Sequence, residues 1–265
     1  MTVQFFAFDE RGDLVSRYSD EAEEIWPPEM QFVHHDPVCE EYWPRLKAVF
    51  PDFQFLACDN SGQQFLAVGN TVPLAWSGQD AMLPDGVPEV LRRAFAEHER
   101  GVRPTALCAI LAGIQPSARS KGLSTEVLIQ MKTVAQSHDL EWLIAPVRPS
   151  RKSSYPLTPI ERYALWRRPD GQLFDPWLRT HERLGARLAG IAPQGNVFRG
   201  TVAEWEQWTG LAFPESGQYI VAGALEPLRI DCDRGEGVLI EQNVWMVHPV
   251  GHDSVQNRDD PSTPF

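Results

Sequence analysis

The segment from Gln115 to Ser124 contains the residues with the clearest capacity for chemistry. Its sequence, Gln-Pro-Ser-Ala-Arg-Ser-Lys-Gly-Leu-Ser, lies between a continuous apolar run and an amphipathic run. A tight turn that enters a helix directs backbone N–H groups and the positive end of the helix dipole at one spot. Gly122 lets the backbone approach a diphosphate closely, and Arg119 or Lys121 can neutralise part of its charge. The pattern indicates an anion site, although glycine and serine are also common in ordinary turns.

A second candidate is His181, which follows a helix start signal. Asp175 can accept hydrogen bonds as an N-cap, Pro176 suits the first helical position, and Gly185 suits the end of the helix. Trp177 lies one turn before His181, so the imidazole should face the apolar side of the helix. A histidine titrates near neutral pH and can give or take a proton there. The alternative is a core histidine bonded to a carbonyl.

The elements that would position these residues follow an α/β pattern. Helices are expected at residues 36–50, 88–101, 124–138, 175–185 and 201–209, and strands at residues 53–58, 64–68, 72–76, 105–114, 142–147, 187–192, 197–199, 219–222 and 238–247. The strand at 105–114, the glycine turn, the helix at 124–138 and the strand at 142–147 together predict a βαβ unit.

The two ends of the chain carry weaker signals. A polar turn between residues 3–8 and 14–18 predicts a β-hairpin within residues 1–28. We expect a single domain over residues 1–250, with an insertion at 193–237 and a polar tail at 251–265.

Composition excludes some partners. The chain has 265 residues, with 36 acidic and 24 basic side chains and a formal charge of -12, which opposes attraction to nucleic acid or an anionic membrane. Without a long apolar run or a signal-peptide pattern, we expect a cytoplasmic protein. The segment Arg148 to Arg168 holds six basic residues against Glu161 alone, which suggests either a small anionic ligand or a solvated loop.

The four cysteines, Cys39, Cys58, Cys108 and Cys232, lack the paired spacing of a metal site or a disulfide framework. We expect reduced and mostly buried thiols, with Cys108 packed in the core rather than acting as a nucleophile.

The glycine turn resembles the acetyl-CoA-binding motif of the GNAT acyltransferase superfamily. That motif has an apolar residue two positions before proline, then Arg or Gln, two residues, Gly, one residue, and Gly or Ala. The matching positions are Ile114, Pro116, Arg119, Gly122 and Ser124, where serine departs from the usual small residue. The run from His181 to Ala186 is similar to a late helix of these enzymes, and the resemblance covers roughly residues 53–192.

The resemblance implies an α/β fold with a mixed central sheet flanked by helices, to which this chain adds the N-terminal hairpin and an enlarged C-terminal region. It implies that pantetheine lies between the strands at 105–114 and 142–147. The implied cofactor-binding residues are Ala109, Leu111, Gly113, Ile114, Arg119, Ser120, Lys121, Gly122, Leu123 and Ser124, with no metal.

In the same resemblance, His181 occupies the position where the family often has a tyrosine that acts as general acid. The glutamate base that members often place on the central strand is missing from residues 105–115. The candidates are Glu182, a residue on the early strands, a water chain, or no base at all.

The resemblance thus implies an N-acetyltransferase that moves acetyl from acetyl-CoA to an amine. The acceptor is expected to be a small-molecule amine or a carrier protein, and a homodimer is compatible with it. The alternatives are a decarboxylase or a carrier-protein S-acyltransferase of the same fold, or a non-catalytic module that binds coenzyme A.

Overall fold

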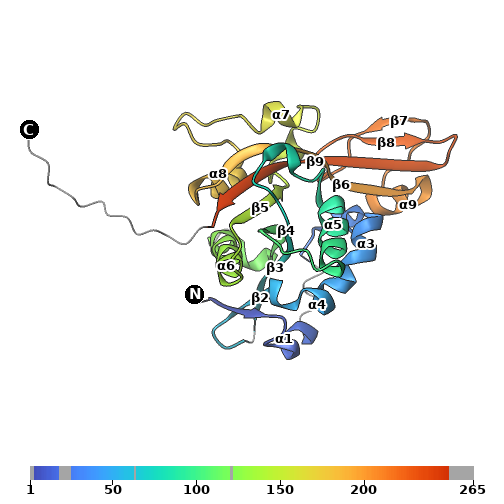
Figure 1. Ribbon diagram of the computed structural model, residues 1–265. Coiled ribbons are helices and arrows are strands. Elements are labelled where there is room, and N and C mark those ends of the chain that lie inside the picture. Colours follow the sequence, from blue (N-terminus) through green and yellow to red (C-terminus); the bar gives the residue numbers. More distant parts are fainter. Residues whose placement is uncertain (1–2, 18–24, 63, 120–121, 251–265) are drawn as a thin grey trace, which may run out of the picture.

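A computed structural model describes residues 3–17, 25–62, 64–119 and 122–250, and its arrangement is shown in Figure 1. The strands in these residues are β1 (Val3–Ala7), β2 (Gln54–Asp59), β3 (Phe65–Leu74), β4 (Ala106–Ile114), β5 (Trp142–Val147), β6 (Arg187–Thr201), β7 (Gly217–Tyr219), β8 (Leu228–Asp231) and β9 (Glu236–Pro249).

The α-helices are α1 (Gly12–Arg17), α3 (Pro37–Tyr42), α4 (Leu46–Val49), α5 (Val87–Glu99), α6 (Leu123–Ser137), α7 (Ile160–Tyr163), α8 (Pro176–Arg183) and α9 (Val202–Thr209). Short 3-10 helices are η1 (Pro28–His34), η2 (Trp43–Arg45), η3 (Pro51–Phe53), η4 (Asp80–Met82), η5 (Pro116–Ala118) and η6 (Lys152–Ser154).

The strands form one sheet in the order β1-β2-β3-β4-β5-β9-β8-β7, and β6 pairs with β9 on its other edge. Among the pairs in the described residues, β4 and β5 run parallel and the others run antiparallel. The mixed central sheet expected from the sequence is therefore confirmed, and its one short parallel ladder in these residues joins the strands on either side of α6.

Helices cover both faces of the sheet because β4 is apolar on both sides. Leu107 packs into a core with α6, whereas its neighbour Cys108 packs into a core with α5. Successive side chains of a strand point to opposite faces, so these are two separate layers. Figure 1 shows α6 on one side of the sheet and α5 with α3 on the other.

Most of the predicted elements are confirmed within one or two residues at their ends. The βαβ unit is present as β4, α6 and β5. The capping predictions also hold: the side chain of Asp175 accepts from the backbone N–H groups of Trp177 and Leu178, and Thr201 forms a capping box with Glu204.

The predicted N-terminal hairpin is wrong. β1 pairs with β2, with Val3 opposite Asp59, and the described part of the expected second strand is helix α1. Leu14 and Val15 are adjacent and both buried, which suits one face of a helix better than the alternation of a strand. Asp13 in the first turn also complements the helix dipole. The predicted tail at 251–265 lies outside the described residues.

Residues 193–237, expected to be an insertion, form an arm at one end of the sheet. β6 and β9 pair as far as Thr201 and Glu236, and the arm lies away from α6 in Figure 1, with β7, β8 and α9. Its core contains the buried Trp205, whose indole N–H donates to the Gly237 carbonyl at 2.9 Å, and Phe32 from η1. The arm is therefore packed on its own core and on the N-terminal segment.

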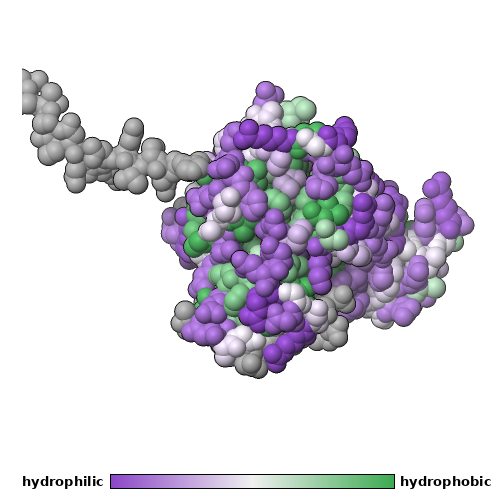
Figure 2. Space-filling view, turned by 60° about the horizontal axis from the view of Figure 1, so that its bottom comes forward, coloured by the Kyte–Doolittle hydropathy of each residue, from purple (hydrophilic) through white to green (hydrophobic). Residues whose placement is uncertain are grey.

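In the view of Figure 2 the surface is largely hydrophilic, and apolar residues reach it as separate patches. Among the residues that the structure describes, no helix is both long enough and apolar enough to cross a bilayer.

Asp175 generates a prediction for stability. Its carboxylate is buried and accepts hydrogen bonds from the Tyr163 hydroxyl at 2.8 Å and from the Arg151 backbone N–H at 2.8 Å, besides capping α8. Asp175→Ala leaves these buried donors unpaired, so we expect a loss of about 3 kcal/mol in the free energy of unfolding. Urea unfolding should show it.

The matched control is Asp170→Ala. Asp170 also accepts a backbone N–H, from Gln172, but it is exposed. We expect a change within about 0.5 kcal/mol. Equal effects of the two substitutions would show that Asp175 is not the junction between α8 and the segment before it.

Candidate functional site

Strands β4 and β5 separate part-way along their length. Their parallel ladder runs from Ala106 opposite Trp142 to Cys108 opposite Ile144 and ends there, although β4 continues to Ile114. From residue 109 onward, no strand in the described part of the chain pairs with this edge of β4. Backbone groups on that edge are thus directed at the space between the two strands.

A β-bulge explains where the separation begins. Asn70 of β3 lies opposite Leu111, but Thr71 lies opposite Ala109, so Ile110 is an extra residue on β4. A bulge bends its strand and increases the local twist, which turns β4 away from β5 just after the last paired residue. On the other side Pro146 of β5 has no N–H with which to extend the ladder.

The edge of β4 lines an apolar slot with a volume of about 220 Å³. The residues around the slot are Leu111, Ala112, Gly113 and Ile114 of β4, Ile25 and Trp26 of the N-terminal segment, and Arg119. Four consecutive residues of a strand can border one cavity only when the cavity lies against the strand edge, because their side chains alternate between faces. The slot therefore follows the backbone of β4.

Gly113 allows the opposite wall to approach closely. A Cβ atom at this position would lie 2.3 Å from Cδ1 of Ile25. A side chain at this position would displace Ile25, so glycine lets Ile25 pack directly on the strand and form one wall of the slot. Neither Ile25 nor Trp26 was predicted as a site residue, because nothing in their spacing indicates that they lie beside β4.

The slot leads to the glycine turn. After β4 the chain forms η5, and Gly122 then adopts a left-handed conformation with φ of 80° as the N-cap of α6. In the part of the chain that the structure describes, no side chain caps this helix, and no atom lies within 4 Å of the place where a Cβ of Gly122 would be. The first N–H groups of α6 thus face open space, as an anion site requires. Ser120 and Lys121 lie outside the described residues.

Arg119 has a different position from the one expected. Its guanidinium donates to the Ile25 carbonyl at 2.7 Å and to the Ile114 carbonyl at 3.2 Å. The side chain therefore joins the turn to the wall of the slot, and it is exposed rather than enclosed. Of the other predicted contacts, Ser124 is half-buried in the first turn of α6, and Leu123 packs in the core beneath it.

His181 faces inward and is held by a second histidine. It is 1 % exposed, and its Nδ1 lies 2.9 Å from Nε2 of His248 on β9. The ring also packs edge-on against Trp177, with ring centroids 4.5 Å apart. Trp177 and Ala109 pack against the core cluster that contains the buried side of α6, and His248 lies opposite Leu143 of that cluster, so the histidine pair lies on the α6 face of the sheet.

Both histidines are neutral near pH 7. Burial lowers the pKa of His181 well below its ordinary value, and the neighbouring His248 adds to this effect. Burial also lowers the pKa of His248 to about 4, assisted by the Lys132 ammonium and opposed by the Leu184 carbonyl. In the described residues, Nε2 of His181 has no hydrogen-bond partner. An uncharged imidazole is thus present with a nitrogen that is buried and has no partner in the described residues.

The other candidates for proton transfer lie elsewhere. Glu182 pairs with Arg167 at 3.1 Å and accepts from the Leu173 backbone N–H, so it points away from His181. Cys108 is fully buried, and burial raises the pKa of its thiol, which fits the expected core role. Cys58 is buried as expected, but Cys232 is exposed.

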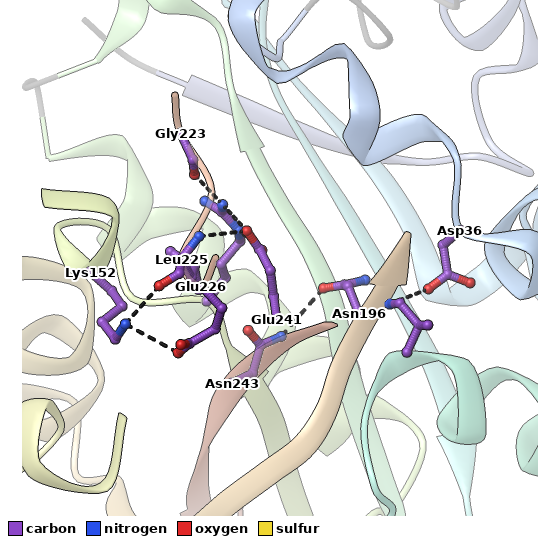
Figure 3. A network of polar contacts seen from close by, with 10 residues as sticks. Asp36, Lys152, Asn196, Gly223, Leu225, Glu226, Glu241 and Asn243 are labelled. Carbon is purple, nitrogen blue, oxygen red and sulfur yellow. Dashed lines mark hydrogen bonds and ion pairs between the residues drawn. The ribbon is translucent and has the colours of Figure 1, made fainter. Parts of the chain in front are cut away.

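In the basic segment between Arg148 and Arg168, two cations pair with carboxylates of the chain itself, which neither the anionic-ligand nor the solvated-loop interpretation predicted. Arg148 forms two hydrogen bonds with the buried Glu241, and Lys152 is buried against the Leu225 carbonyl at 2.7 Å and Glu226 at 3.1 Å (Figure 3). These cations neutralise the chain's own carboxylates. Charge counting along the sequence could not show this, because the carboxylates come from distant residues, Glu226 in the arm and Glu241 on β9.

The open edge of β4, the slot along it and the helix start after it form an arrangement suited to an extended ligand with amide groups and a terminal anion. No family model matches the chain. It is 31 % identical over 253 residues to the arginine N-acetyltransferase avaD of Aspergillus versicolor, an alignment that covers 85 % of this chain and 86 % of that protein.

Two solved structures share the fold. The loading GNATL domain of CurA from Lyngbya majuscula has a TM-score of 0.59 at 15 % identity, covering 94 % of this chain and 98 % of that one. The GphF GNAT-like decarboxylase in complex with isobutyryl-CoA has a TM-score of 0.53 at 14 % identity, covering 95 % and 100 %. The chain belongs to the GNAT superfamily. It is an acyltransferase of that superfamily.

The neutral histidine pair predicts how stability depends on pH. Because the folded state lowers both pKa values, the unfolded chain binds protons first, below about pH 6.5. Stability is therefore complete above that pH and is lost as the pH falls toward 4, by up to about 1.4 kcal/mol per pH unit for each histidine. Urea unfolding at pH 7, 6 and 5 should show a smaller loss for His248→Gln than for the wild type. Equal losses would contradict the buried neutral pair.

Proposed function

We propose that this enzyme acetylates the amine of a small, polar molecule, with arginine as the first acceptor to test. The observation that supports the proposal most is the unpaired edge of β4, which borders an apolar slot leading to the free N–H groups of α6. A pantetheine arm carries amide groups on a thin chain, so it can bond to the strand edge and place its diphosphate at the helix start.

The proposed division of roles follows from this geometry. Backbone groups of residues 109–113 bind the arm, and one of their N–H groups polarises the thioester carbonyl near the bulge. The turn at Gly122, with Ser124 and the neighbouring Ser120 and Lys121, holds the diphosphate, and Arg119 closes the turn against Ile25. His181 transfers the proton near the point where β4 and β5 separate.

The curated relative supports the acceptor class. That protein is an arginine N-acetyltransferase, and the identity extends over most of both chains. The solved structure of a decarboxylase is 14 % identical and shows the fold alone, so it does not favour the decarboxylase alternative. A carrier-protein acceptor, a homodimer and a cytoplasmic location stay predictions from the sequence.

The direct test measures release of free thiol from acetyl-CoA with arginine, lysine and the decarboxylated analogue of arginine, with mass spectrometry of the product. We expect acetylated arginine, and a lower kcat/KM for the analogue if the acceptor's carboxylate is recognised. Acetyl-CoA that binds without acetylation of any amine would overturn the proposed transfer.

The helix start can be tested at Gly122 by a pair of substitutions. Asn and Asp tolerate the left-handed backbone better than most residues, and they differ here by one charge. Gly122→Asp places a carboxylate at the proposed diphosphate site, so we expect KM for acetyl-CoA to rise by about tenfold or more, about 1.4 kcal/mol.

The control is Gly122→Asn, for which we expect a change within about threefold, because the amide carries no charge. Calorimetric titration with coenzyme A supplies the binding constant without turnover. Equal affinities for the Asp and Asn variants would place the diphosphate elsewhere.

A further inference from the structure

His181 and His248 share a single proton between their facing nitrogens. With Nδ1 of His181 2.9 Å from Nε2 of His248, one nitrogen must carry the hydrogen and the other must accept it. Both rings are buried, and the only charged group that acts on them in the described residues is Lys132 of α6. The Lys132 ammonium lowers the pKa of His248, so this ring stays neutral and one of its two nitrogens is a hydrogen-bond acceptor.

The hydrogen bond decides which atom of His181 is left free. If Nδ1 carries the hydrogen and donates to His248, then Nε2 has a lone pair and no partner in the described residues. The Leu184 carbonyl raises the pKa of His248, against the effects of burial and Lys132. Nδ1 of His248 also has no hydrogen-bond partner in the described residues, so each ring has one nitrogen in the pair's hydrogen bond and one unpaired nitrogen.

We propose that His248 is a positioning residue: it accepts the Nδ1 hydrogen of His181 and so presents Nε2 of His181 as a base to the reacting centre. This inference rests on the acetyl transfer proposed above. It also accounts for the absence of a carboxylate between residues 105 and 115, because one neutral imidazole can serve as the base and then as the acid.

The proton balance of the step is as follows. The lone pair of a neutral amine forms the N–C bond to the thioester carbonyl, and the nitrogen becomes positively charged. Nε2 of His181 takes one proton from this nitrogen, and His248 stabilises the imidazolium through the Nδ1 hydrogen. The C–S bond then breaks with its electron pair on sulfur, and Nε2 returns the proton to give the amide and the free thiol of coenzyme A.

The test compares His248→Phe, which keeps a ring but loses the acceptor, with His248→Gln, whose amide oxygen can accept the same hydrogen. We expect kcat to fall by about 10- to 100-fold in His248→Phe with KM for both substrates nearly unchanged, and most of the activity to return in His248→Gln. The matched control is His138→Gln, which changes a half-buried histidine that bonds the Val134 carbonyl at the end of α6. It should keep wild-type kcat.

A second measurement is independent of turnover. The ¹⁵N shifts of the imidazoles in the free enzyme report the tautomer, and we expect Nδ1 of His181 to be protonated and Nε2 to be bare in the wild type. In His248→Phe we expect a mixture of tautomers. Failure of acetyl transfer with this tautomer intact would count against the proposed function alone, whereas an active His248→Phe with an unchanged tautomer would overturn the role of His248.

Discussion

The structure depends on where the hydrogen-bonded ladder between β4 and β5 ends, which is at Cys108, six residues before the end of β4. Backbone N–H and C=O groups of a strand are costly to leave unpaired away from water, so an apolar slot beside an open strand edge is unfavourable unless a ligand completes it. Here β5 leaves β4 after Cys108, and apolar residues surround β4 at positions 111–114, where the slot lies. In the described part of the chain, the sheet therefore lacks a strand beside β4 after Cys108, and an extended molecule with amide groups can form the hydrogen bonds that this strand would have formed.

The gap must also stay open when no ligand is bound. β5 is held on its far side by β9, in a ladder that runs from Trp142 opposite Pro249 to Val147 opposite Val244. Directly after β5, Arg148 bonds to Glu241 of β9 and to the Gly223 carbonyl, so the exit of the strand is fixed to the arm (Figure 3). The ion pair between Arg148 and Glu241 fixes the end of β5 to β9. The bulge at Ile110 bends β4 at the point where its ladder with β5 ends. The two strands are therefore held apart beyond Cys108.

Local sequence signals were enough to predict the parts of the site that lie along one stretch of chain. The strand, the turn at Gly122 and the helix after it follow each other within about thirty residues, and their periodicity and capping residues define them. The partners that come from distant segments were not predictable in this way. His248 meets His181 only because β9 runs beside β5 in one register, and Ile25 reaches β4 only because Gly113 leaves room.

The N-terminal error has the same origin. A polar turn between two apolar runs suits a hairpin locally, but β1 finds a better partner in β2, and Leu14 with Val15 is then free to pack as a helix. Pairing between strands that are distant in the sequence, as between β1 and β2, overrides a local turn pattern when that pattern is the only evidence for a hairpin.

The choice of histidine at position 181 has a chemical consequence of its own. A tyrosine hydroxyl can supply a proton to a leaving thiolate, but it is a poor base at neutral pH because its neutral form has no basic nitrogen. A buried neutral imidazole has a lone pair at that pH, and the lower its pKa, the more readily it releases the proton it has just taken. Without a carboxylate on β4, a group that both takes and returns a proton is needed, and the lowered pKa of His181 favours the return to sulfur.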